Sequence, residues 1–297
     1  MSTSNFFVTG ATGFVGEAVV RELLAAGHQV LGLARSDAAA ATLTNLGAEV
    51  HRGDLLNTES LAAGAHASDG VIHTAFIHDF SAFAASVATD QRAVETLVTA
   101  LEGSGKPLVS TSGIALMAPG KMSIESEASL PEAFRAASER IVLAAADRGV
   151  RSSIVRLPPS VHGKGDHGFV PALIDIARRK GFSAYPAEGL RRWAAVHRFD
   201  AAKVYRLAVE KGVAGSRLHA VAEEGIPLKT IAETIGAELG IPVRSITSQE
   251  AAEHFEWLAH FVNIIDHPTS STITRNALGW EPQGQPGLLE DMRENYF

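Results

Sequence analysis

The turn that follows the first apolar segment limits the possible fold more than any other feature. Three glycines, Gly10, Gly13 and Gly16, stand at G-x-x-G-x-x-G spacing between the apolar run 6–8 and an amphipathic helix that begins at Phe14. The first glycine permits a tight turn, the second lets backbone amides approach a ligand, and the third lets the helix pack closely on the strand. Strand, turn and helix in this order predict a dinucleotide site, with the pyrophosphate at the helix N-terminus.

Strand and helix patterns alternate over the first two-thirds of the chain. Short apolar runs predict further strands at residues 30–33, 49–51, 71–73, 107–110 and 152–157. Helical periodicity predicts the intervening helices at residues 37–46, 58–65, 83–102 and 132–148. This alternation is typical of a doubly wound parallel sheet with helices on both faces, so the predicted fold class is α/β and Rossmann-like.

The alternation becomes less regular after Pro158-Pro159, where helical patterns are separated by loops rich in Gly and Pro. These helices are predicted at residues 170–180, 200–211, 228–239 and 250–261, with Asp200 as the cap of the second one, and a strand at 217–221 should extend the sheet. We therefore predict a dinucleotide-binding domain at 1–165 and a smaller, mostly helical substrate lobe at 166–297. Residues 192–222 are expected to return to the first domain.

Composition excludes several classes of function. The 297 residues contain 26 Lys and Arg against 33 Asp and Glu, a net charge of −7 that argues against a nucleic-acid binder. Without cysteine there is no disulfide, thiolate nucleophile or Cys-bound metal. Residues 1–5 lack the basic region of a signal peptide and no apolar run suits a membrane helix, so a cytoplasmic protein is expected. The close histidine pairs, 162 with 167 and 254 with 260, lack i, i+4 spacing, so no metal is predicted.

The end of the second strand indicates which dinucleotide is preferred. An acidic residue there binds the ribose 2′-hydroxyl of NAD, whereas Arg suits the 2′-phosphate of NADP. Ala34 occupies the acid's position and Arg35-Ser36 follow, offering a guanidinium and a hydroxyl to a phosphate. The negative charge of Asp37 slightly disfavours a phosphate at this position, and Arg35 could also be a solvated loop residue. The prediction is NADP(H) in preference to NAD(H), with NAD(H) still possible.

Several segments together resemble the short-chain dehydrogenase/reductase superfamily, in its extended or atypical epimerase/dehydratase-like group. The segments that carry the resemblance are Thr9 to Gly16, Gly53-Asp54-Leu55, Val71 to Ala75, Leu108 to Gly113, Arg156 to Gly163 and Trp193 to Ala202. The resemblance implies that Asp54 holds the adenine amino group and that Val71 to Ala75 lines the cofactor. The full set of expected cofactor residues is Gly10, Thr12, Gly13, Phe14, Val15, Gly16, Arg35, Ser36, Asp54, Leu55, Thr74, Ala75, Phe76, Ser110, Leu157, Pro158, Ser160 and Val161.

The usual catalytic pair of this family, Y-x-x-x-K, has no counterpart here. No Tyr precedes Tyr185, and no Lys lies between Lys121 and Lys164. Alternative registers place either Pro131 and Arg135 or Arg135 and Glu139 at the pair. Asp90 stands where the family usually has Asn.

Four residues remain as catalytic candidates: Ser112, Thr111, Arg135 and His162. Ser112 matches the family's catalytic serine, and Thr111 is the adjacent alternative. Both could instead cap the strand and bind the cofactor. Arg135 could stabilise an oxyanion or be a solvated helix residue. His162 stands at the family's Tyr position in V-Y-G, where it could donate a proton or be structural.

Candidate substrate residues surround a cleft expected at the carboxyl ends of the strands. They are His78, in a loop that could overhang the site, and Phe169, Tyr185, Trp193 and His197 in the second lobe. Arg191-Arg192 could attract an anionic substrate or be solvated. The predicted function is an NADP(H)-dependent oxidoreductase of a small carbonyl or alcohol, monomeric or homodimeric, with a proton donor other than tyrosine. The alternatives are a non-catalytic NADP(H)-binding sensor or scaffold and a sugar-nucleotide epimerase or dehydratase.

Overall fold

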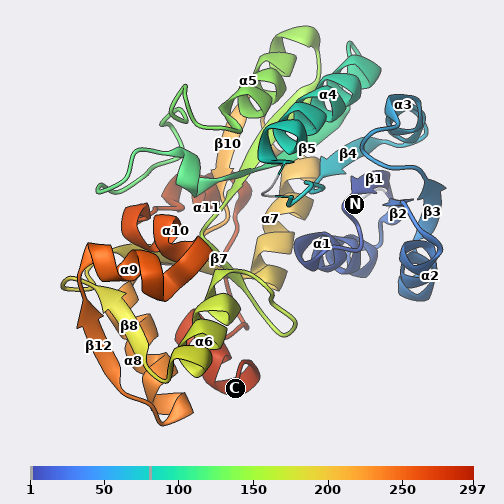
Figure 1. Ribbon diagram of the computed structural model, residues 1–297. Coiled ribbons are helices and arrows are strands. Elements are labelled where there is room, and N and C mark those ends of the chain that lie inside the picture. Colours follow the sequence, from blue (N-terminus) through green and yellow to red (C-terminus); the bar gives the residue numbers. More distant parts are fainter. Residues whose placement is uncertain (1–2, 80–81) are drawn as a thin grey trace.

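A parallel sheet of seven strands forms the centre of the computed structural model, which describes residues 3–79 and 82–297 (Figure 1). The strand order is β10-β6-β5-β4-β1-β2-β3, and every neighbouring pair is parallel. The strands are β1 (Asn5–Thr9), β2 (Gln29–Ala34), β3 (Glu49–Arg52), β4 (Gly70–His73), β5 (Pro107–Gly113), β6 (Arg151–Leu157) and β10 (Ser216–His219). The predicted doubly wound α/β fold is confirmed, and β10 extends the sheet as expected.

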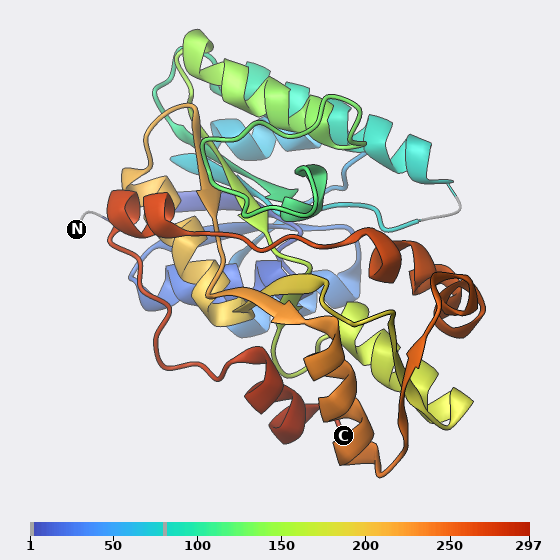
Figure 2. The ribbon, with the colours of Figure 1, turned by 90° about the vertical axis from the view of Figure 1, so that its left-hand side faces the viewer.

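Helices cover both faces of this sheet. Seen almost edge-on, α4 and α5 lie along one face in cyan and green, and α1 and α7 along the other in blue and gold (Figure 2). The helices of this part are α1 (Phe14–Ala25), α2 (Asp37–Leu46), α3 (Thr58–His66), α4 (Phe83–Leu101), α5 (Ala136–Ala144) and α7 (Arg198–Lys211). Neighbouring β1 side chains enter opposite layers, Phe7 packing with α4 and Val8 with α1 and α7. Both faces are therefore dry, as the continuous apolar runs of the strands require.

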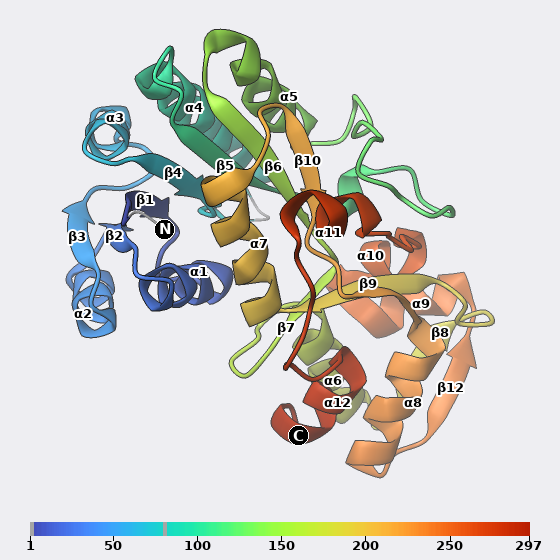
Figure 3. The same ribbon diagram turned by 180° about the vertical axis from the view of Figure 1, so that it is seen from behind.

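The second lobe contains small sheets as well as the predicted helices (Figure 3). Strands β7, β9 and β11 form one sheet, and β8 pairs with β12 in another. The bounds are β7 (Ser160–His162), α6 (Phe169–Lys180), β8 (Ser183–Pro186), β9 (Arg192–His197), β11 (Glu223–Pro227), α8 (Leu228–Leu239), β12 (Val243–Ile246), α9 (Ser248–Phe255), α10 (Ala259–Ile264), α11 (Thr272–Leu278) and α12 (Leu288–Asn295). The division at 165/166 stays a prediction. In the part of the chain that the structure describes, no helix is both long and apolar enough to span a membrane.

Three helix boundaries differ from the sequence prediction. Helix α7 begins at Arg198 because the His197 side chain accepts a hydrogen bond from the Phe199 amide, so His197 is the cap. The prediction that Asp200 caps this helix is therefore wrong, and Asp200 instead pairs with Lys203 at 2.9 Å. The single helix predicted at 250–261 is interrupted at Glu256, whose φ of +54° ends α9.

The third boundary matters for the site. The helix predicted at 132–148 begins only at Ala136, and a 3-10 turn continues it at 145–148. Residues before Ala136 form tight turns, with amide hydrogen bonds from Ala133 to Leu130 and from Ala136 to Ala133. Arg135 therefore lies at the N-terminal end of α5, where its side chain faces the end of β5.

Candidate active site

The glycine-rich turn packs against the end of β4. Gly10 adopts a φ of +69°, which favours glycine, and a Cβ there would lie 2.7 Å from the Thr74 hydroxyl oxygen. A Cβ at Gly16 would overlap the carbonyl oxygen of Gly10. Gly13 is different, because it is exposed and its amide closes the turn by donating to Gly10 O at 2.9 Å. Two glycines thus permit close packing and one leaves the helix end open.

The open end of α1 has the donors that a dinucleotide pyrophosphate needs. Gly13 is the N-cap residue, and because glycine has no side chain, no N-cap side chain occupies the first amides of the helix. The amides of Phe14, Val15 and Gly16 precede the first hydrogen bond of the helix pattern, and the helix dipole adds positive potential there. This end of the fold therefore fits the predicted cofactor.

The end of β2 offers positive charge. Arg35 is exposed and has no hydrogen bond or ion pair to residues 3–79 or 82–297. Ser36 caps α2 by accepting from the Ala39 amide at 3.2 Å. Asp37, which argued against NADP, is paired with Arg52 at 2.7 Å. The arrangement leaves a free guanidinium beside a helix N-terminus, and the nearby Asp37 carboxylate forms an exposed ion pair with Arg52.

The other expected cofactor residues also lie at the carboxyl edge of the sheet. Asp54 Oδ1 accepts from the Leu56 amide at 2.8 Å and the Asn57 amide at 3.1 Å. Thr74 donates to the carbonyl of Thr9 at 2.8 Å, which fixes the start of the β4–α4 loop beside the glycine turn. Thr12 is exposed, Leu55, Ala75, Phe76, Leu157 and Val161 are half-buried, and Ser110, Pro158 and Ser160 are buried. Their cofactor roles stay predictions.

Asp90, on α4, is the centre of a buried polar network. It is 1% exposed and accepts hydrogen bonds from Ser138 at 2.6 Å, Arg135 at 3.2 Å and His73 at 3.4 Å. Burial alone raises the pKa of this carboxyl, but the His73 hydrogen bond and the Arg135 charge outweigh it and lower the pKa to about 2. Asp90 is therefore ionised at neutral pH and holds Arg135 in place.

Arg135 joins this network to the end of β5 and to the β4–α4 loop. Its Nη2 also donates to the carbonyl of Thr111 at 3.1 Å, and its guanidinium carbon lies 4.4 Å from the centre of the Phe76 ring. Its buried Nε has no acceptor in the described chain. The Phe76 ring also contacts His78 at 5.2 Å. A cation with a spare donor thus lies beside an exposed imidazole.

The two β5 hydroxyls are engaged with other protein groups. Ser112 donates to Glu139 Oε2 at 2.8 Å, and Glu139 forms a fully buried ion pair with Arg156. Thr111 donates to the His73 carbonyl at 2.9 Å, so the Tyr205 hydroxyl, 2.8 Å away, is the donor to Thr111. Neither hydroxyl has a spare proton for a substrate oxygen. The two candidates lie on opposite faces of the sheet, Ser112 toward α5 and Thr111 toward α7.

His162 is buried in the second lobe and is apart from this network. Its Nδ1 lies 2.8 Å from Asp291 of α12, and its Nε2 lies 4.0 Å from Glu223. Its ring meets His197 edge to face at 5.3 Å. Burial, and then the charge of His162, lower the pKa of His197 to about 4. Both histidines are therefore placed as packing groups between β7, β9 and α12, and a catalytic or substrate role for either stays a prediction.

The remaining substrate candidates do not form one group. Phe169 contacts Trp193 at 5.7 Å, but Trp193 is fully buried in the core of the lobe. Tyr185 lies in β8, where its ring faces Lys229 at 5.8 Å. Burial, and then the charges of Arg135 and His167, lower the pKa of His78 below its ordinary value, which links this loop electrostatically to both residues.

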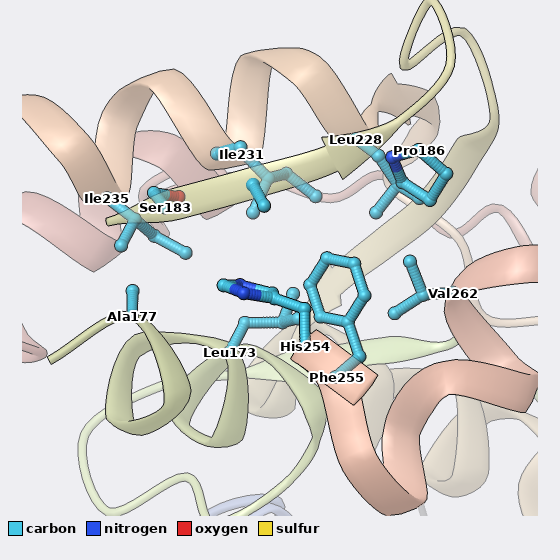
Figure 4. A pocket seen from close by; sticks show the side chains of 12 residues that line it. Leu173, Ala177, Ser183, Pro186, Leu228, Ile231, Ile235, His254, Phe255 and Val262 are labelled. Carbon is cyan, nitrogen blue, oxygen red and sulfur yellow. The ribbon is translucent and has the colours of Figure 1, made fainter. Parts of the chain in front are cut away.

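A small cavity in the second lobe is not a substrate site. Figure 4 shows His254 and Phe255 pointing into it from α9, opposite Ile231 and Ile235 of α8. Its volume of about 10 Å³ is at the lower limit for a single water. In the described ranges, 3–79 and 82–297, no group of three or more His, Asp or Glu side chains is placed to hold a metal ion.

Sequence reasoning missed two features of this region. The Glu139–Arg156 pair joins α5 to β6, and although each residue belongs to a segment considered above, no sequence pattern indicates that the two meet. Arg198 stands over Phe14, the first residue of α1, with 5.0 Å between its guanidinium carbon and the ring centre. Nothing in the sequence near Arg198 indicates this contact.

Comparisons with known proteins agree with the fold and the glycine turn. Residues 6–221 match the family model described as NAD dependent epimerase/dehydratase family. The chain is 48% identical to an uncharacterised protein of Schizosaccharomyces pombe, over 98% of this chain and 99% of that protein. It is 31% identical to a 4-hydroxy-2-methyl-3-oxo-4-farnesyl-3,4-dihydroquinoline-1-oxide ketoreductase of Stigmatella aurantiaca, over 59% of this chain and 56% of that enzyme.

A solved structure shows the same architecture. A dTDP-glucose 4,6-dehydratase from Streptomyces venezuelae with NAD bound has a TM-score of 0.78 at 19% identity, covering 98% of this chain and 95% of that one. The family match and the fold agree with the motifs at the carboxyl edge of the sheet. The chain therefore belongs to the NAD-dependent epimerase/dehydratase family.

Proposed function

We propose that this protein is an NADP(H)-dependent oxidoreductase that reduces a small carbonyl compound, or oxidises the corresponding alcohol, without a tyrosine acid. The observation that carries the proposal is Arg135, a cation with an unused donor at the carboxyl edge of the sheet. Arg135 lies against the ring of Phe76. Phe76 comes two residues after Thr74, and Thr74 packs on the glycine turn. A cation in this place stabilises the negative charge that develops on a carbonyl oxygen during reduction.

The chain's own residues then have distinct roles. A bound nicotinamide dinucleotide supplies or accepts the hydride. Arg135, held by Asp90, donates hydrogen bonds to the substrate oxygen, and the imidazolium of His78 provides the proton that completes the alcohol. His78 suits this role because it is exposed and lies beside Phe76. Its lowered pKa makes the imidazolium a stronger acid and a minor form at neutral pH, so turnover by this route should rise as the pH falls. In the oxidation direction the neutral imidazole of His78 accepts the hydroxyl proton, and Arg135 stabilises the alkoxide while the hydride leaves for the bound cofactor.

The preference for NADP(H) is supported by Arg35. Its free guanidinium and the N-terminus of α2 suit a 2′-phosphate, and Asp37 is paired with Arg52. NAD(H) binding remains compatible with the family. A cytoplasmic location and a monomeric or homodimeric state stay predictions.

A small neutral substrate is supported over a sugar nucleotide. Arg192 pairs with Asp266 through two contacts of 3.0 and 3.2 Å, and Arg191 donates to the carbonyl of Asn263. These two cations are therefore occupied within the protein and offer little to a diphosphate. The ketoreductase among the relatives also acts on a ketone by its name.

The second candidate is a non-catalytic NADP(H) sensor or scaffold. It is favoured by the engagement of both β5 hydroxyls, since Ser112 donates to Glu139 and Thr111 to the His73 carbonyl. A protein of this kind binds the cofactor tightly but turns over no carbonyl.

The test is NADPH consumption across a panel of aldehydes, ketones and imines, run beside NADH. Arg135→Gln should lower kcat/KM by about 100-fold, since it removes one preorganised stabilising charge. The dissociation constant for NADPH should stay within twofold, and His78→Gln should lower turnover about tenfold as a lost general acid does. Arg140→Gln on the exposed face of α5 is the matched control and should change neither quantity. Tight NADPH binding with no consumption on any carbonyl would favour the sensor.

A further inference from the structure

Arg198, the first residue of α7, places a positive charge against the glycine turn. Its guanidinium carbon lies 5.0 Å from the centre of the Phe14 ring and 4.8 Å from that of Phe199. Phe14 is the first residue of α1, whose N-terminal amides face outward for a ligand. Arg198 therefore contacts the first residue of α1 from a part of the chain more than 180 residues away in sequence.

The stem of the Arg198 side chain packs closely against Gly163. Gly163, with a φ of +142°, leaves room for it, because a Cβ there would lie 3.2 Å from Arg198 Cγ and 3.3 Å from Cδ. The same Cβ would lie 3.1 Å from His197 Nε2. The turn after Gly163 is fixed by Asp166, which accepts from the Gly168 amide at 2.7 Å and from the Tyr296 hydroxyl at 2.8 Å.

The charge of Arg198 has no counter-charge. Its Nε is buried without an acceptor, and among the residues that the structure describes no carboxylate lies within ion-pair distance. Arg206, two turns further along the same helix, is paired with both Glu22 and Glu210. A half-buried guanidinium without a partner is costly, and polar groups in such places usually have one.

His167 is a second hydrogen-bond donor beside Phe14. Its ring contacts the edge of Phe14 at 5.8 Å, and the side chain is exposed. Phe14 thus contacts both the Arg198 guanidinium and the His167 imidazole. His167 comes four residues after Gly163, and Arg198 packs against Gly163. Both side chains contact Phe14 at the N-terminus of α1.

We propose that Arg198 binds the pyrophosphate of the dinucleotide, together with the α1 amides and with His167 as an auxiliary donor. This assignment rests on the dinucleotide site of the proposed function, but not on catalysis. It makes cofactor binding depend on the second half of the chain, because the pyrophosphate then joins α1 to the start of α7. The chemistry required is a bidentate or charge-assisted contact to phosphate oxygens, which guanidinium provides better than an ammonium.

The test uses two ligands that cannot react. ADP-ribose contains the pyrophosphate but no nicotinamide and no 2′-phosphate, whereas adenosine 2′-monophosphate contains the 2′-phosphate but no pyrophosphate. Their dissociation constants are measured by calorimetry for the wild-type protein, Arg198→Met, Arg198→Lys and Arg35→Ala. Arg198→Met keeps the apolar stem between Phe14 and Phe199, and Arg178→Ala on the exposed end of α6 matches the change in net charge.

The expected result is a crossed pattern. Arg198→Met weakens ADP-ribose binding at least about tenfold, the loss of one charge-assisted contact, and leaves adenosine 2′-monophosphate within twofold. Arg35→Ala does the reverse, Arg198→Lys lies between Met and wild type, and Arg178→Ala changes neither ligand. Unchanged ADP-ribose affinity in Arg198→Met would overturn the proposal, as would equal weakening of both ligands. Because ADP-ribose undergoes no reaction, the outcome is independent of whether the protein reduces carbonyls.

Discussion

Two regions at the same edge of the sheet use their polar groups in opposite ways. At the β1–α1 and β2–α2 turns, the α1 amides, Arg35 and Arg198 lack partners within the described chain. Between β5 and α5, Ser112, Thr111 and Glu139 are saturated by bonds to other protein groups. The first, called the open region below, leaves these donors unpaired, whereas the second, the closed region, pairs its polar groups within the protein.

The difference explains how the fold of this family can be kept while its catalytic hydroxyls are not available. Dinucleotide binding needs glycine geometry and open donors, and these are intact. Proton transfer needs a group with a free proton near the substrate, and the β5 hydroxyls no longer offer one. Arg135 lies on the border of the two regions, because one of its nitrogens is paired with Asp90 and another has no acceptor among the described residues.

The largest effect on the free energy of unfolding is expected when the buried ion pair of the closed region is broken. Glu139→Gln removes the counter-charge of Arg156, which is completely buried, and should lower the free energy of unfolding by about 3–5 kcal/mol. Ser112→Ala removes only one hydrogen bond to that carboxylate and should cost about 1–2 kcal/mol. Urea unfolding measures both. Equal small losses would show that the pair is not the structural centre of this region.

The next effect comes from the glycines of the open region. Gly16→Ala forces a Cβ onto the Gly10 carbonyl and should destabilise the protein by about 3 kcal/mol. Gly13→Ala meets only Gly10 O at 3.2 Å, so it should leave the melting temperature nearly unchanged while weakening NADPH binding. Thermal melts and fluorescence titration separate the two outcomes. A similar loss of stability in both variants would contradict the distinction between Gly16, which permits close packing, and Gly13, which leaves the helix end open.

Asp90 gives the closed region a pH dependence of known sign. Its pKa in the folded protein is about 2, below the ordinary 3.8, so it adds stability above the ordinary pKa that is lost as the pH falls toward 2. This contribution amounts to about 2 kcal/mol at neutral pH. The stability difference between wild type and Asp90→Asn should therefore shrink between about pH 4 and pH 2. A difference that stays constant over this window would mean that Asp90 is not ionised in the native state.

The smallest effect concerns the choice of cofactor. Arg35→Ala should weaken NADPH binding about tenfold, since it removes one charged partner of the 2′-phosphate, and leave NADH binding unchanged. Arg21→Ala, on the exposed face of the neighbouring helix α1, is the control. Equal affinity for both cofactors, unchanged in Arg35→Ala, contradicts the NADP(H) preference.

Local sequence patterns predicted the glycine turn and Arg35 of the open region but not the Arg198 contact there, and they were insufficient for the closed region. The strand, glycine turn and helix are contiguous, so spacing predicts the glycine-turn end, and the alternation of strands and helices predicts a parallel sheet. The Asp90–Arg135 and Glu139–Arg156 pairs connect segments from different elements, and no periodicity indicates which charge meets which. Ser112 resembles a catalytic serine by position, yet its proton is donated to Glu139, which only the packed structure reveals.

Helix ends show the same limit on a smaller scale. Asp200 is a residue type that often caps helices. Here the His197 side chain accepts from the Phe199 amide, and α7 begins at Arg198, before Asp200. The continuous pattern at 250–261 contains no glycine or proline to indicate a break. The break at Glu256 is instead accompanied by tertiary ion pairs, with Arg179 holding its carboxylate at 2.8 Å.

The most direct test of the proposed reduction is to follow the hydride itself. NADPH carrying deuterium at the transferred position is incubated with the protein and a carbonyl that supports consumption, and the product alcohol is analysed by mass spectrometry. One deuterium is expected in each product molecule for the wild-type protein, with a rate about 100-fold lower in Arg135→Gln. Product without deuterium, or an undiminished rate in Arg135→Gln, would contradict the proposed reduction.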